Sequence, residues 1–199
     1  MDTGLILSCL QENWVWQLGD NHPLGWSLTA GYALAAVMTA LVAARGGFPA
    51  DTRLRERAFW TVVALALIFL AVNKQLNLQT TLRLAGRCIA QAEGWYQTRD
   101  TVQRQFVLAL TAGLSVTGLL ILWWLRRTLW RNLPVLAGGL VLAAFIALRA
   151  ADIGNLRHGM RWQFLQIPAE RWSEAVGIAL IVIGAAFAWR RGRRRGRRE

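Results

Sequence analysis

Five long apolar stretches alternate with short polar segments along the chain. Each stretch approaches the roughly 20 residues that a helix needs to cross a bilayer core about 30 Å thick. The pattern therefore predicts an all-α integral membrane protein with five transmembrane helices in a single domain, residues 1–189, followed by a basic cytoplasmic tail, residues 190–199. The expected spans are residues 24–44, 58–78, 106–125, 133–153 and 173–189.

The charged residues between the stretches are distributed unevenly. Fourteen of the 23 basic residues fall in residues 45–57, 126–131 and 190–199, where only three acids occur. Basic residues accumulate in cytoplasmic loops. We therefore expect these segments to face the cytoplasm, which places the N-terminus outside and the C-terminus inside.

The tail after the fifth stretch contains seven arginines within its ten residues. Such a segment is attracted to anionic phospholipid, by about 1 kcal/mol per basic residue near the surface. Aromatic residues do not alternate with these arginines, as they do in many segments that bind nucleic acid. Anionic phospholipid, not nucleic acid, is the partner that the tail predicts.

The second stretch passes directly into a polar sequence, so its helix is expected to extend beyond the outer face. Counted from Ala58 at about 1.5 Å per residue, Asn73 and Lys74 lie roughly 23 Å across the bilayer. Arg149 and Asp152 reach the same depth in the fourth stretch, and Asp152 is the acid expected there. The predicted polar cluster comprises Asn73, Lys74, Asn77, Gln79, Arg149, Asp152, Asn155 and His158.

Two interpretations of this cluster remain open. Ionisable groups inside a bilayer usually face a bundle interior or a wet cavity, so the cluster predicts a pocket for a lipid headgroup, a quinone or an anionic solute. Alternatively, Lys74 and Arg149 extend to the headgroups while Asp152 pairs with one of them and fixes helix packing. Small residues at helical spacing, such as Gly31/Ala35, Gly113/Thr117, Gly139/Ala143 and Gly184/Ala188, favour close helix packing but identify no particular pair.

Cofactor and catalytic signals are sparse. Haem ligation through His22 and His158 is not favoured, because haem-binding bundles usually hold their histidines within spans on facing helices. The two histidines also lack a zinc-site spacing, and no serine lies in a G-x-S-x-G sequence. We predict no cofactor and no metal. Cys9 and Cys88 are both expected outside, where a disulfide can form, but two free thiols remain an equal alternative.

The outward segments combine tryptophan, tyrosine and arginine. These residue types are enriched in interface hot spots, and they also occur on helices that lie among lipid headgroups. Both interpretations remain open. The candidate docking residues are Trp95, Tyr96, Arg99, Arg161, Trp162 and Trp172.

Three short sequences carry a resemblance: residues 73–79 (NKQLNLQ), residues 94–96 (GWY) and residues 148–151 (LRAA). In these, the chain resembles a group of uncharacterised bacterial multi-pass membrane proteins. The resemblance implies a multi-pass protein of a bacterial membrane and no particular activity.

Two functions of different classes follow. The first is a non-catalytic accessory or assembly subunit of a bacterial inner-membrane complex, which docks other membrane subunits through its outward Trp/Arg-rich segments. The alternative is a protein that binds or transports a small molecule or lipid, or a membrane enzyme, with its pocket around Lys74, Arg149 and Asp152. The lack of a catalytic motif favours the first.

Overall fold

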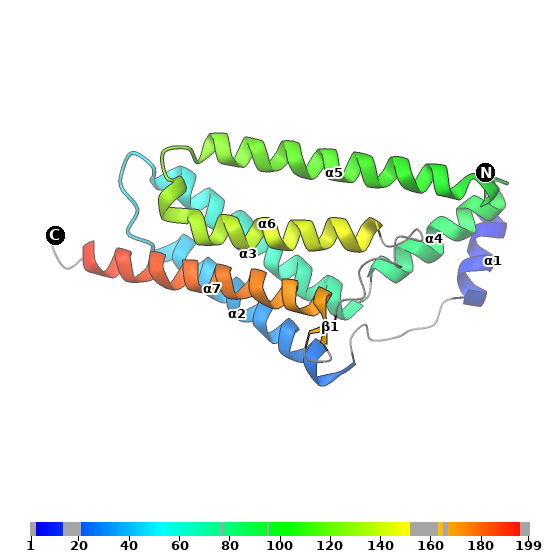
Figure 1. Cartoon of the computed structure of the whole chain (residues 1–199), viewed down its shortest axis with the longest axis horizontal. Coiled ribbons are helices and arrows are strands. Elements are labelled where there is room, and N and C mark those ends of the chain that lie inside the picture. The colour runs from blue at the N-terminus through cyan, green and yellow to red at the C-terminus, as the bar shows by residue number, and fades with distance from the viewer. Residues whose placement is uncertain are drawn as a thin grey trace.

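A computed structural model describes residues 3–13, 21–76, 78–94, 96–151, 163–164 and 167–195. Over these residues the protein is almost entirely helical (Figure 1). Five of the described α-helices are long and apolar enough to cross a membrane, which confirms the five expected stretches: α2, α3, α5, α6 and α7. The helices are α1 (Thr3–Asn13), α2 (Pro23–Arg45), α3 (Arg53–Leu76), α4 (Leu78–Ala92), α5 (Arg99–Trp124), α6 (Leu129–Ala151) and α7 (Ala169–Arg195), with a 3₁₀ turn η1 (Tyr96–Thr98) and a small antiparallel hairpin of β1 (Gln163–Phe164) and β2 (Ile167–Pro168).

Local sequence explains several helix ends. Pro23 occupies the first turn of α2, where its missing N–H is not needed, and the His22 side chain accepts a hydrogen bond from the Leu24 N–H. The same helix ends at Arg45, before Gly46. The acid Glu56 lies in the first turn of α3 and the base Lys74 in its last turn. Each charge therefore interacts favourably with the end of the helix dipole nearest to it.

Helices α2, α3, α6 and α7 form the packed bundle. The most extensive contacts are those of α6 with α7 and of α2 with α3, and α2 also packs along α7. Trp60, Leu67, Tyr32 and Ile181 are among the buried residues of the core. Helices α6 and α7 approach closely at Gly138, where an added Cβ would lie 2.7 Å from the Gly177 carbonyl oxygen.

Helix α5 lies beside this bundle and its main contacts are with α6 and η1 (Figure 1). None of the residues in its apolar window is buried, whereas 22% to 33% of the corresponding windows of the other four helices are. Hydrophobic side chains such as Leu108 and Leu119 are exposed along it. Helix α5 is therefore attached to the bundle much more loosely than the other four membrane-length helices.

The N-terminal helix α1 packs on α4 at one end of the molecule (Figure 1). A disulfide joins Cys9 of α1 to Cys88 of α4, which is one of the two alternatives that the sequence left open. Cys88 is buried in this contact. The polar sequence that follows the second stretch is divided between α3, which ends at Leu76, and the separate helix α4.

The two ends of the bundle differ in what they carry. The α2–α3 loop, the turn between α5 and α6 and the C-terminal part of α7 lie together at one end, which we call the Glu56 end (Figure 1). The opposite end, the Lys74 end, carries α4 and the β-hairpin. Helix α7 continues through Arg195, so the first arginines of the basic tail extend the fifth membrane-length helix.

Candidate functional site: a buried ion pair between two membrane-length helices

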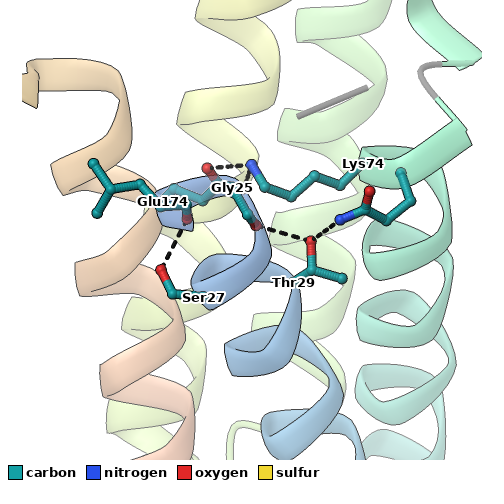
Figure 2. Close-up of polar contacts among 7 residues, drawn as sticks. Gly25, Ser27, Thr29, Lys74 and Glu174 are labelled. Atoms are coloured by element: carbon teal, nitrogen blue, oxygen red, sulfur yellow. Dashed lines mark hydrogen bonds and ion pairs between the residues drawn. The ribbon is translucent and has the colours of Figure 1, made fainter. Parts of the chain in front are cut away.

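Lys74 forms a two-pronged ion pair with Glu174 (Figure 2). Its Nζ lies 3.0 Å from Oε1 and 3.0 Å from Oε2 of the carboxylate. The two side chains are only 9% and 5% exposed. Removing a charge from water costs several kcal/mol, and an opposite charge with good hydrogen-bond geometry offsets part of that cost. The pair thus connects α3 to α7 across 100 residues of sequence.

A second polar contact lies beside the ion pair and connects α3 to α2 (Figure 2). The Gln75 Nε2 donates to the Thr29 hydroxyl at 2.8 Å, and that hydroxyl donates to the Gly25 carbonyl at 3.0 Å. The Gln75 Oε1 is buried and has no hydrogen-bond partner among the described residues. Consecutive residues of α3 therefore hold it to both α7 and α2, and one buried acceptor remains unsatisfied.

Glu174 corrects one part of the expectation, that Asp152 is the only acid at the depth of Lys74. The sequence did contain a signal, because Glu174 is the second residue of the expected fifth span, 173–189. An acid at the start of an otherwise apolar span can turn toward a neighbouring helix, and only the packing of α7 on α2 and α6 fixes the face it occupies. Asp152 lies outside the described residues.

The other members of the predicted cluster are placed only in part. Asn73 is half-buried on α3, one residue before Lys74. Gln79 belongs to α4 and Arg149 to α6. Their side chains lie outside the described part of the structure. Asn77, Asn155 and His158 lie outside the described residues.

Three of the candidate docking residues, Tyr96, Arg99 and Trp172, belong to described elements of the same end. Tyr96 is half-buried in η1, and Trp172 is exposed near the start of α7. Arg99 begins α5, although its side chain is outside the description. Trp95, Arg161 and Trp162 lie outside the described residues.

His22 has a local structural role as the residue that caps α2. Across the described ranges, no three side chains of the types His, Cys, Asp and Glu converge in a way that could hold a metal ion. The geometry of the described site thus consists of an ion pair and neutral hydrogen bonds between helices.

A second buried ion pair, which the sequence did not predict, lies at the Glu56 end. Glu56 is 1% exposed, and its Oε1 lies 3.1 Å from Arg131 Nη1 in an ion pair and accepts a hydrogen bond from the Thr52 hydroxyl at 2.9 Å. From sequence, Glu56 counts simply as one of the few acids in a basic loop. Its burial depends on α6, because the Arg131 that partners it comes from the first turn of that helix.

No protein-family model, curated protein or solved structure matches this chain. The function of the chain is therefore inferred from its residues and their geometry.

Proposed function

We propose that the chain is a non-catalytic accessory or assembly subunit of a bacterial inner-membrane complex. The observation that carries this proposal is α5, a membrane-length helix with no buried residue in its apolar window. Association of helices in lipid depends on close van der Waals packing and interhelical hydrogen bonds. Helix α5 uses little of its surface for such packing within its own chain, so most of that surface is available to a partner.

The surface of α5 has the residue pattern that suits a partner transmembrane helix. Ala109, Gly113 and Thr117 are exposed and follow each other at four-residue spacing, on one face of the helix. A Cβ added at Gly113 would meet nothing within 4 Å. Small residues at this spacing let a second helix approach closely. A helix of another membrane subunit is the occupant that we propose for this face.

The ion pair at the Lys74 end supports a structural role for the predicted polar cluster. A two-pronged contact between Lys74 and Glu174 neutralises the buried ammonium and joins α3 to α7. A carrier or enzyme would use such a charge on its ligand. With Glu174 beside it, Lys74 is better suited to fix helix register than to bind an anionic ligand.

The orientation belongs to the same proposal. The arginine-rich segments of the chain lie together at the Glu56 end (Figure 1). The excess of basic residues in cytoplasmic loops supports a cytoplasmic Glu56 end. The N-terminus, α4 and the candidate docking residues would then face the periplasm.

One observation favours the alternative function, a binding or transport protein or membrane enzyme with a pocket around Lys74, Arg149 and Asp152. The Gln75 Oε1 is a buried acceptor without a partner among the described residues, and such groups are rare unless a ligand or water satisfies them. A ligand with a hydroxyl or amide donor would complete that hydrogen bond.

Native mass spectrometry of the protein, extracted gently from its host membrane, distinguishes the two functions. The accessory-subunit proposal predicts a stable assembly with other membrane proteins. Gly113→Leu should release those partners, while Gly139→Leu should not. Gly139 is the matched control, because it is also exposed with nothing within 4 Å of an added Cβ but lies on α6.

A wild-type protein that leaves the membrane without any other protein would refute the proposal. If that lone protein carried a fixed extra mass, the pocket function would take its place.

A further inference from the structure

The Glu56 end contains a small cavity that the proposed docking function does not use. It lies where the α2–α3 loop, the start of α6 and the end of α7 meet. Residues of the α2–α3 loop, α3, α6 and α7 line it. The residues that matter here are Gly47, Glu56, Arg131, Asn132, Arg191 and Gly192.

The charges around this cavity favour an anion. Two arginines, Arg131 and Arg191, and one acid, Glu56, are among the residues that line it. Arg131 contacts Glu56 through Nη1 and remains 35% exposed. Because a guanidinium has five N–H donors in a planar fork, the remaining donors of Arg131 are available to a second acceptor. Arg191 has no acidic partner among the described residues and contributes a full positive charge.

The backbone adds to the same preference. The cavity lies at the N-terminal turn of the 23-residue helix α6, which contains Arg131 and Asn132. The dipole of a helix favours an anion near such a terminus, although the N–H groups of Arg131 and Asn132 themselves donate to the Thr128 carbonyl. The helix end and the two arginines therefore act in the same direction.

Arg191 is held in place by a contact between two glycines. A Cβ added at Gly192 would lie 2.7 Å from the Gly47 nitrogen, and one added at Gly47 would lie 2.9 Å from the Gly192 Cα. Only glycine allows the backbone of α7 to lie this close to the α2–α3 loop. The contact fixes the backbone that carries Arg191 next to the α2–α3 loop, and this places Arg191 among the residues that line the cavity.

The surroundings are those of a membrane surface. Trp130, next to Arg131, is 86% exposed, and guanidinium groups stack on the rings of Trp123 and Trp189 at this end. Tryptophan and arginine are typical of the zone where lipid headgroups lie. A phosphate group is the anion most abundant in that zone.

We propose that this cavity is a specific site for the phosphate of one anionic phospholipid, held between Arg131 and Arg191. It differs from diffuse attraction of the arginine tail to a charged surface, because it uses two defined side chains on α6 and α7. The inference does not depend on the accessory-subunit proposal. A phosphate group could also come from free inorganic phosphate, and the experiment separates the two sources.

The test uses the full chain, purified in detergent and stripped of lipid, with binding measured by native mass spectrometry. Phosphatidylglycerol is the probe, and phosphatidylcholine is the zwitterionic control. We expect one tightly retained phosphatidylglycerol per chain. Arg191→Gln should weaken that binding about tenfold, as expected for the loss of a charge-assisted hydrogen bond.

Arg193→Gln is the matched control. It removes the same charge from the same segment of α7, but Arg193 stacks on Trp189 and does not line the cavity. Its binding of phosphatidylglycerol should stay within about twofold of the wild type. Because Arg191 makes no ion pair with Glu56, Arg191→Gln should fold normally even if Arg131→Gln does not.

Three results would overturn the proposal. Equal losses for Arg191→Gln and Arg193→Gln would show diffuse attraction. Equal retention of phosphatidylcholine and phosphatidylglycerol would exclude recognition of an anionic lipid. Retention of inorganic phosphate, with no retention of phosphatidylglycerol, would assign the site to a soluble anion.

Discussion

The ion pair between Lys74 and Glu174 predicts strongly coupled effects of mutation. Glu174→Gln leaves the buried Lys74 ammonium without the adjacent carboxylate, and Lys74→Met leaves the carboxylate without the ammonium. Removing one member of a buried pair typically costs about 3–5 kcal/mol, because the remaining charge is still shielded from water. Since both groups lie near a bundle end, where a charged side chain can reach water, we expect about 3 kcal/mol for each single substitution.

The double variant should be much less affected than the sum of the two. With neither charge present, the methionine and glutamine side chains place only neutral groups in the same volume, so neither position of the pair holds a buried charge. We expect a coupling energy of at least about 1.5 kcal/mol, since replacing both members of such a pair is often close to neutral. That value lies well above the average of about 0.6 kcal/mol for polar couplings between membrane helices.

The assay is the free energy of unfolding in detergent, measured for the wild type, both single variants and the double variant by tryptophan fluorescence. The chain has 11 tryptophans to report on the bundle. Strictly additive losses would refute the reasoning, because they would mean that the two groups do not interact. Single variants as stable as the wild type would refute the burial argument instead.

Two further predictions concern the ends of the molecule. Gly192→Ala should lower the free energy of unfolding by about 1–3 kcal/mol, because the added Cβ overlaps the α2–α3 loop. Gly139→Ala has open space around it and should raise the free energy of unfolding by up to about 1 kcal/mol through helix propensity. Equal effects of the two substitutions, measured by chemical unfolding, would contradict the close contact at Gly192. Cys88→Ser should make α1 sensitive to protease at conditions where the bundle resists, because it removes a link across 79 residues, and the entropy of closing a loop of that length corresponds to about 4 kcal/mol. Unchanged digestion of α1 would show that packing on α4 alone holds it.

The apolar pattern predicts the helices well because lipid allows little else. Backbone groups in a bilayer must be satisfied within the segment, so a long apolar stretch is a helix. The expected first span, 24–44, differs from the helix Pro23–Arg45 by one residue at each end. The ends follow from proline, glycine and charge, which are all local signals.

The contacts between helices could not be predicted in the same way. Of four glycines found at small-residue spacing, Gly31 contacts Ile178 and Gly184 lies against Val135, whereas Gly113 and Gly139 meet nothing within 4 Å. The sequence pattern is the same for all four, and only the rotation of each helix decides which glycine is packed. The tryptophan and arginine patterns leave the same ambiguity about which surface a partner covers.

The acids show this limit most clearly. Depth along a span can be counted from sequence, and Lys74 lies in the last turn of α3. The partner of Lys74 depends on which of the neighbouring helices turns an acid toward it, and Glu174 on α7 does so. Likewise, Glu56 is a loop acid by sequence, and α6 converts it into a buried one by supplying Arg131.

Two ion pairs join helices of the bundle, and α5 takes part in neither of them. Both involve α3, with Glu56 in its first turn joined to α6 and Lys74 in its last turn joined to α7. A buried pair stabilises little on balance, but it penalises any shift of register that separates the charges. Helix α3 is therefore joined to α6 at the Glu56 end and to α7 at the Lys74 end. Helix α2 takes part in neither pair, but it packs along α3 and α7 and is bonded to α3 through Gln75 and Thr29. Helix α5 has neither an ion pair in the described structure nor such packing, and so its position is the one that a partner helix can set at the lowest cost.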